Sequence, residues 1–223
     1  MIMKKILAAS LLFAALLVSA GNWREDFSKD KPDKKGFPEG WKQEGTLPGV
    51  PASKVSLRDG VLHLESDKSS GGLLRILKTV DLNKTPVMRW RWRSLELPKR
   101  GDGRDSDRDD QAVGLYLILP GFWQKKSLSY HYETETPKGQ WGETSYLCGV
   151  VKVTFTVLRN ETDTLGEWYV EERNVAEDLK KCYGEIPKEF AIGIISNSNN
   201  TASRAAAEID YIEFVPAPAE KAK

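Results

Sequence analysis

Over most of its length the chain alternates between short apolar runs and clusters of turn-forming residues. Apolar runs separated by Gly, Pro, Asn and Asp are typical of the strands of a β-sandwich or barrel. The pattern predicts strands over residues 61–65, 73–80, 87–97, 112–119, 128–133, 150–158, 168–173, 190–196 and 209–215. Residues 112–119 are apolar at successive positions, which indicates a central strand covered on both faces.

One short helix interrupts this pattern. Asn174 is a suitable N-cap, Glu177 and Asp178 stand in the first turn, and Gly184 suits a left-handed C-terminal stop. We therefore expect an all-β fold, an antiparallel jelly-roll-like β-sandwich with one short helix, over residues 21–215. Residues 216–223 are rich in Pro, Ala and Lys, and we expect them to form a disordered tail.

The first twenty residues differ in composition from the rest. Lys4 and Lys5 precede apolar residues 6–18, and Val18, Ser19 and Ala20 place small side chains where a signal peptidase cleaves. The apolar run is shorter than the roughly 20 residues that a membrane span needs. Residues 1–20 predict a cleavable signal peptide, a periplasmic or secreted protein, and no membrane span in the mature chain; an uncleaved anchor is the alternative.

The charge of the mature chain is close to balanced. The whole chain has 33 basic and 32 acidic residues, and removal of Lys4 and Lys5 leaves 31 against 32. Nucleic acid and anionic membranes bind basic surfaces, so this balance argues against either as the main partner. In an oxidising compartment the two cysteines, Cys148 and Cys182, form a candidate disulfide; two unpaired thiols are the alternative.

The motifs of common catalytic sites are absent from the sequence. It has no His-Glu-x-x-His, Cys-x-x-Cys, Gly-x-Ser-x-Gly, phosphate loop or Gly-x-Gly-x-x-Gly. Its two histidines are His63, which falls inside a predicted strand, and His131, which alternates with Tyr130 and Tyr132 and so faces away from both rings. His131 is a candidate ligand contact, with an ordinary hydrogen-bonded histidine as the alternative.

The sequence Arg89-Trp90-Arg91-Trp92-Arg93 places residues of two kinds on the two faces of one strand. Because side chains alternate, the Trp rings share one face and Arg89, Arg91 and Arg93 share the other. We expect the Trp face to be core. The Arg face is a candidate shelf for an acidic ligand, and Arg173 is a further candidate cation; ion pairs with carboxylates on neighbouring strands are the alternative.

Two other clusters carry candidate chemistry. Carboxylates crowd residues 102–110, and their spacing suggests a calcium site formed by Asp105, Asp107, Asp109 and Asp110. Nearby Lys and Arg nearly neutralise this segment, so a self-paired loop is the alternative, and we expect no other cofactor. Trp123 and Trp141 stand near glycines, where an exposed ring can stack on a sugar; a ring packed under its own loop is the alternative.

The order of these motifs resembles the bacterial domain of unknown function 3047 family. The resemblance rests on the Trp-Arg-Trp strand, on Glu172-Arg173-Asn174-Val175, and on the closing Asp210-Tyr-Ile-Glu-Phe214. The layout is also similar to jelly-roll carbohydrate-binding modules. The family name implies no activity. The chain departs from the family pattern at Gly114, where the family has Arg, and at residues 197–199, where it has Asp-x-Asp.

These features together favour an exported non-catalytic β-sandwich protein that binds carbohydrate, a cell-envelope glycan or an acidic small ligand. One alternative is a polysaccharide lyase or glycoside hydrolase that acts on an acidic glycan and uses the arginines to neutralise a uronate. Another is a structural envelope protein without a small ligand. The sequence does not indicate an oligomeric state.

Overall fold

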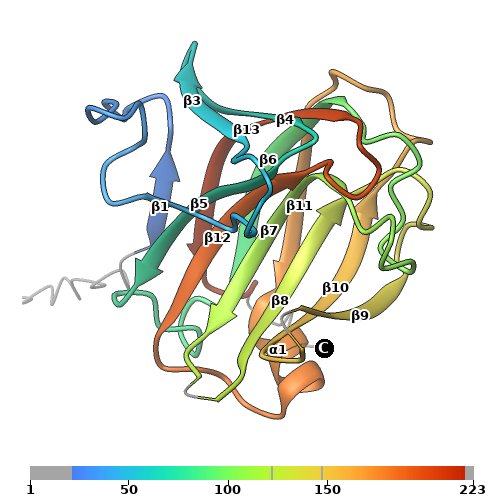
Figure 1. Ribbon diagram of the computed structural model, residues 1–223. Coiled ribbons are helices and arrows are strands. Elements are labelled where there is room, and N and C mark those ends of the chain that lie inside the picture. Colours follow the sequence, from blue (N-terminus) through green and yellow to red (C-terminus); the bar gives the residue numbers. More distant parts are fainter. Residues whose placement is uncertain (1–21, 122, 147, 219–223) are drawn as a thin grey trace, which may run out of the picture.

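The computed structural model describes residues 22–121, 123–146 and 148–218. Within these ranges the chain forms thirteen strands and one α-helix. The strands make two sheets that pack face to face, with the helix at one end (Figure 1). This arrangement is the expected jelly-roll-like β-sandwich. The predicted signal peptide and part of the predicted tail lie outside the described residues.

The smaller sheet has six strands. Their order is β11–β6–β13–β4–β3, and β1 also pairs with β13. The strands are β1 (Trp23–Asp26), β3 (Lys54–Arg58), β4 (Val61–Asp67), β6 (Val87–Glu96), β11 (Tyr169–Asn174) and β13 (Arg204–Val215).

The larger sheet has seven strands in the order β2–β5–β12–β7–β8–β10–β9. They are β2 (Lys42–Glu44), β5 (Ser70–Leu77), β7 (Gln111–Leu119), β8 (Lys125–Tyr132), β9 (Trp141–Tyr146), β10 (Val151–Arg159) and β12 (Phe190–Asn197). All nine predicted strands are present. The sequence pattern missed β1, β2, β3 and β9, which are short and rich in polar residues.

One pair of strands departs from the expected antiparallel arrangement. β8 and β10 are parallel, whereas the other paired strands of both sheets are antiparallel. After β8 the chain passes to the edge of the sheet and forms β9 first. It then turns back and places β10 between β9 and β8, so β10 runs in the same direction as β8 (Figure 1).

Aromatic side chains from both sheets fill the centre of the sandwich. Trp90 and Trp92 of β6 are fully buried and pack edge to face, with ring centroids 5.5 Å apart. Across the interface Trp90 contacts Tyr130 at 5.4 Å, and Trp92 contacts Tyr132 at 5.8 Å. The Trp face of the Arg-Trp strand is therefore core, as predicted. The outward side chains of β6 and β8 consequently lie on opposite sides of the molecule.

The helix α1 (Val175–Tyr183) begins and ends where its capping residues predict. The Asn174 side chain accepts a hydrogen bond from the Glu177 backbone N–H at 3.2 Å. Gly184 adopts a left-handed conformation with φ of 77°, and its N–H donates to the Lys180 carbonyl. Val175 and Leu179 are fully buried, so the helix closes one end of the core.

Candidate functional site

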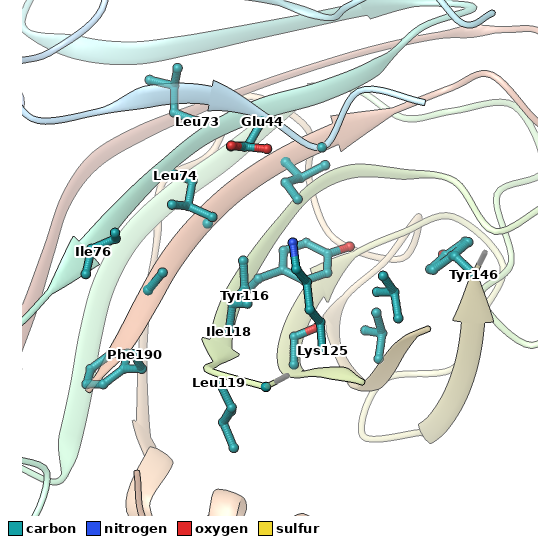
Figure 2. A pocket seen from close by; sticks show the side chains of 18 of the residues that line it. Glu44, Leu73, Leu74, Ile76, Tyr116, Ile118, Leu119, Lys125, Tyr146 and Phe190 are labelled. Carbon is teal, nitrogen blue, oxygen red and sulfur yellow. The ribbon is translucent and has the colours of Figure 1, made fainter. Parts of the chain in front are cut away.

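A groove of about 810 Å³ lies on the outer face of the larger sheet (Figure 2). It crosses β5, β12, β7, β8 and β10, and the side chains that form its floor point away from the core because they alternate with core residues along each strand. Its volume is within the roughly 300–1,000 Å³ typical of small-molecule sites.

Strand register places the floor residues in rows that run across the sheet. One row joins Leu74, Gly193 and Tyr116, which are paired neighbours on β5, β12 and β7. The adjacent row is formed by Ile76, Ala191, Ile118, Ser127 and Val153. These two rows are mostly aliphatic, and they cover roughly 19 Å from β5 to β10 at the usual strand spacing.

Gly193 leaves a gap in the middle of the floor because it has no side chain. A Cβ atom at this position would lie 3.4 Å from both Ile118 Cδ1 and Tyr116 Cβ, which is ordinary contact distance. An alanine therefore fits here without displacing its neighbours, whereas a longer side chain would project into the groove. The depth of the groove at its centre depends on this missing side chain.

The end of the groove next to the aliphatic rows is polar but already hydrogen-bonded. Ser70, Asn197 and Gln111 are neighbours across β5, β12 and β7. The Asn197 amide accepts from the Gln111 backbone N–H and donates to the Asp109 carbonyl, while the Gln111 side chain donates to the Tyr116 hydroxyl. Most of this row's hydrogen-bonding capacity is therefore used within the protein.

The opposite edge of the groove carries charges without partners. Lys78, Lys125 and Glu189 are exposed there, and Glu44 is exposed above β5. Within the described residues, these four side chains make no hydrogen bond or ion pair. In Figure 2 the Lys125 side chain reaches over the floor in the direction of Tyr116. The charged atoms at this edge are available to a ligand.

A chain of hydrogen-bonded polar residues is buried beside the groove, on the same outer face of β8 as the floor residue Ser127. Ser129, His131 and Glu133 project from the same face of β8 and the residue after it. Ser129 Oγ lies 2.7 Å from His131 Nε2, and His131 Nδ1 lies 2.7 Å from Glu133 Oε1. His131 also stacks on Phe155, with centroids 5.1 Å apart.

This order of groups is that of a nucleophilic triad, but the serine is inaccessible. Ser129 and Glu133 have no exposed surface and His131 is 1% exposed. A catalytic serine must reach the substrate carbonyl and be flanked by donors for the oxyanion. Ser129 does not line the groove, so in this structure the three residues form a buried hydrogen-bonded chain next to it. His131, a candidate ligand contact, is buried here with both ring nitrogens engaged.

A buried carboxylate lies beside one wall of the groove. Asp109 is 2% exposed and accepts a hydrogen bond from the hydroxyl of Tyr146, which lines the groove. Burial raises the pKa of the Asp109 carboxyl, and the hydrogen bond from Tyr146 opposes this rise. Tyr146 separates the carboxylate from the open part of the groove.

The predicted arginine shelf lies on the smaller sheet, opposite the groove. Each guanidinium pairs with carboxylates of neighbouring strands at 2.6 to 3.2 Å: Arg89 with Glu172 and Glu213, Arg91 with Asp210, and Arg93 with Glu208. Arg91 and Arg93 also lie 4.7 and 4.5 Å from the centre of the Trp168 ring. On this face the arginines therefore form ion pairs with carboxylates of neighbouring strands, which was the alternative to a ligand shelf.

Arg173 and Trp141 form a third location, next to α1. Arg173 makes a forked ion pair with Asp178, with nitrogen–oxygen distances of 2.8 to 3.0 Å. The Trp141 ring is partly buried against the core, with Arg173 5.9 Å and Lys181 5.1 Å from its centre. The candidate ligand residues of the sequence thus fall into separate places, and none of them lines the groove.

The structure separates the four carboxylates of the candidate calcium site, Asp105, Asp107, Asp109 and Asp110. Asp105 pairs with Arg108 at 2.9 Å, Asp109 is buried beside Tyr146, and Asp110 accepts two hydrogen bonds from Thr201 at 2.7 Å. Across the described ranges, no group of three or more acidic, His or Cys side chains is arranged to hold a metal ion. The arrangement gives no support to calcium binding, because protein groups already engage the carboxylates of Asp105, Asp109 and Asp110.

The candidate disulfide is not formed. Cys148 is an exposed free thiol in the turn after β9, and Cys182 is a free thiol in the last turn of α1, partly buried against the core. Burial raises the pKa of the Cys182 thiol. Sequence spacing could not decide this pairing, because a disulfide requires the two Cβ atoms to meet in space.

Sequence reasoning missed the groove residues. Leu74, Ile76, Ile118 and Ile195 read as ordinary strand residues, since an aliphatic side chain on a predicted strand is usually core. The available signal was the apolar character of both faces of residues 112–119. We took this pattern to mean burial on both faces, whereas one face of β7 forms part of the groove floor.

Fold and groove together define a jelly-roll-like β-sandwich with an open groove on the outer face of its larger sheet. The chain belongs to the family described as "Protein of unknown function (DUF3047)", whose profile matches residues 39–213. No curated protein sequence matches the chain. In the part of the chain that the structure describes, no helix has the length and apolar character to cross a bilayer.

Several solved structures are similar to the chain. The family 11 carbohydrate-binding module of Lic26A-Cel5E from Clostridium thermocellum has 10% identity and a TM-score of 0.45, over 88% of this chain and 95% of that one. The xyloglucanase domain of NopAA from Sinorhizobium fredii has 11% identity and a TM-score of 0.48, over 80% and 95%. The family GH12 endoglucanase 3 of Trichoderma harzianum has 10% identity and a TM-score of 0.39, over 88% and 98%.

Proposed function

We propose that the protein is an exported, non-catalytic binding module that holds a glycan in the groove of the larger sheet. The observation that carries this proposal is the open groove of about 810 Å³ with uncommitted charges along one edge. Elsewhere on the surface many charges are paired, as the arginines of β6 illustrate. A sugar can lay its C–H surface on the apolar floor and the rings of Tyr116 and Tyr146 while its hydroxyls meet Lys78, Lys125 and Glu44.

Export is the part of the proposal that rests on sequence alone. Lys4, Lys5, the apolar residues 6–18 and the small residues 18–20 support a cleavable signal. Cell fractionation with N-terminal sequencing of the mature protein tests it. A chain starting at Gly21 in the periplasmic or culture fraction is the expected result, and an intact N-terminus on a cytoplasmic protein would contradict it.

A catalytic role is less well supported. A glycosidase needs two carboxyl groups facing the scissile bond from either side of the sugar. Two carboxylates line the groove, but they stand at its opposite ends: Glu44 is beside Gly72 and Glu189 precedes Phe190, the partner of Leu77, so about 17 Å of strand β5 separates these two positions. The buried carboxylates Asp109 and Glu133 are 2% and 0% exposed and do not line the groove. The groove therefore offers a binding surface, with no acid–base pair in contact with a bound sugar.

Affinity electrophoresis tests the glycan proposal. The mature protein is run through gels that contain a neutral β-glucan or an acidic polysaccharide, beside Lys125→Ala and the control Lys54→Ala. Lys54 is an exposed lysine of β3, on the other sheet. We expect at least one polysaccharide to retard the wild type and the control, and Lys125→Ala to migrate faster. Unretarded migration on every polysaccharide would overturn the proposal.

A further inference from the structure

The floor of the groove differs in chemistry from a surface that holds sugar alone. Sugar rings pack well on flat aromatic faces, but the central rows of this floor are mainly aliphatic. Ile76 is 61% exposed there, and Leu74, Ile118, Ile195 and Val151 are each partly exposed. A continuous exposed aliphatic surface on a folded domain marks a site that an apolar partner covers.

Hydrogen-bonding groups are scarce in the same place. The amide row at one end of the groove is bonded within the protein, and Tyr146 donates its hydroxyl proton to Asp109. A ligand that covered the floor with hydroxyl groups would leave many of them without a partner, which costs free energy for each buried polar group. A chain of CH₂ groups makes no such demand.

Charges of both signs line the groove, and Lys125 is set apart from the two glutamates: Glu189 lies at the β12–β5 end of the edge, Glu44 lies on β2, and Lys125 lies on β8. Lys125 is exposed, has no ion pair among the described residues, and reaches over the floor in Figure 2. On β8 it lies two residues from Ser127, which belongs to the aliphatic row of Ile76 and Ile118. An anionic group at Lys125 would therefore adjoin a chain that lies along that row.

From these observations we infer that the ligand of the groove is an anionic amphiphile. An aliphatic chain lies across Ile76, Ile118 and the open space above Gly193, and an anionic group meets the Lys125 amine. The inference rests on the proposed function in taking the groove as the ligand site, and it adds the chemical class of the part that covers the floor. A carboxylate and a phosphate both have the required charge, so the test includes each.

Isothermal titration calorimetry, below the critical micelle concentration of each probe, tests whether an alkyl chain binds in the groove. The probes are decyl, dodecyl and tetradecyl phosphate, dodecanoate, dodecyl maltoside, maltose and inorganic phosphate. We expect the alkyl phosphates to bind about fourfold more tightly for each CH₂ added, from the transfer free energy of a buried methylene. Binding that does not depend on chain length, or no saturable alkyl binding, overturns the inference.

Two variants at the floor, with Gly193→Ala as a control, locate the alkyl chain of the ligand. Gly193→Leu should abolish binding of dodecyl phosphate, whereas Gly193→Ala should keep it, since an alanine Cβ makes only ordinary contacts. Ile76→Ser, at an exposed position that does not endanger folding, should weaken binding at least tenfold. Unchanged binding by both a folded Gly193→Leu protein and Ile76→Ser shows that the chain does not lie on this floor.

A third variant tests the anionic group and separates its sources. Lys125→Ala should weaken dodecyl phosphate and dodecanoate severalfold at low salt, leave dodecyl maltoside unchanged, and be restored by Lys125→Arg. Preference for one anion identifies phosphate or carboxylate as the head. If the wild type binds dodecyl maltoside as tightly as both anionic probes, the inference that the ligand carries an anionic group is overturned. If polysaccharide retards the protein but no alkyl compound binds, this inference is overturned and the glycan proposal is supported. If alkyl compounds bind but no polysaccharide retards the protein, the glycan proposal is overturned and this inference is supported.

Discussion

On the smaller sheet, the outward side chains of β6 are Arg89, Arg91 and Arg93, and each is paired with a carboxylate of a neighbouring strand. On the larger sheet, the outward side chains of β7 include Tyr116 and Ile118, which help to form an open groove. Both strands are central and both present a regular row of side chains to the outside. They differ in whether the neighbouring strands complement that row.

This difference indicates which face is adapted to a ligand. A row of arginines bonded to carboxylates has little left to offer, since a ligand must first displace those partners. An aliphatic floor beside unpaired charges gains from being covered. Complementarity within the protein is thus the property that separates a structural face from a binding face, and the type of residue alone does not show it.

The largest effect is expected from the buried polar residues beside the groove. Glu133 accepts hydrogen bonds from the Gly103 N–H and the Thr136 hydroxyl and contacts His131. Glu133→Ala leaves His131 Nδ1 buried without a partner, whereas the Gly103 N–H keeps Thr136 and the Thr136 hydroxyl keeps Asp102. The change should lower the free energy of unfolding by about 1–3 kcal/mol. Urea unfolding measures this loss.

The matched control is Glu135→Ala, two residues further on. Glu135 pairs with Arg100 and Arg108 but its side chain is 32% exposed, so its removal should cost about 1 kcal/mol at most. Equal losses in the two variants would mean that the buried network beside the groove is no more important to the fold than a surface ion pair.

A second, smaller effect concerns the pH dependence of stability. Burial raises the folded-state pKa of Asp109 above its unfolded value. Such a group contributes stability that is complete below the unfolded pKa and is lost as the pH rises through the folded pKa. Asp109→Asn, which carries no charge, should remove this loss. Urea unfolding at a series of pH values measures it.

Asp105 provides a control of opposite sign in the same loop. The hydrogen bond from Arg108 lowers the pKa of Asp105. Its contribution is present above the unfolded pKa and is lost as the pH falls through the folded value, so Asp105→Asn should flatten the acid side of the profile. Parallel profiles for Asp109→Asn and the wild type would show that the carboxyl beside Tyr146 is not destabilised by burial.

The fold could be predicted from sequence wherever the information is local. Alternation placed Trp90 and Trp92 in the core, and Asn174 and Gly184 marked the ends of α1. The parallel pairing of β8 and β10 could not be predicted, because it depends on where β9 joins the sheet. Strand partners far apart in sequence are not encoded in the pattern of any one strand.

The candidate site was harder to predict for the same reason. Arg91 looked available because its partner, Asp210, is 119 residues away. Ile118 looked like core because nothing in its own strand shows that the outer face of the larger sheet is left open. The Ser129–His131–Glu133 chain differs, because its signal was present in the sequence. A spacing of two residues along one strand places all three side chains on one face, although only His131 was singled out from the sequence.

The smallest stability effects come from exposed positions on the two faces, and they compare the faces directly. Arg91 has a side chain 38% exposed in an ion pair, and Ile76 is 61% exposed. Arg91→Ala and Ile76→Ser should each change the free energy of unfolding by about 1 kcal/mol or less. Only Ile76→Ser should weaken binding of dodecyl phosphate, because Arg91 lies on the other sheet. If Arg91→Ala instead removed binding in the same titration while Ile76→Ser kept it, the arginine face would be the ligand surface and the groove would not.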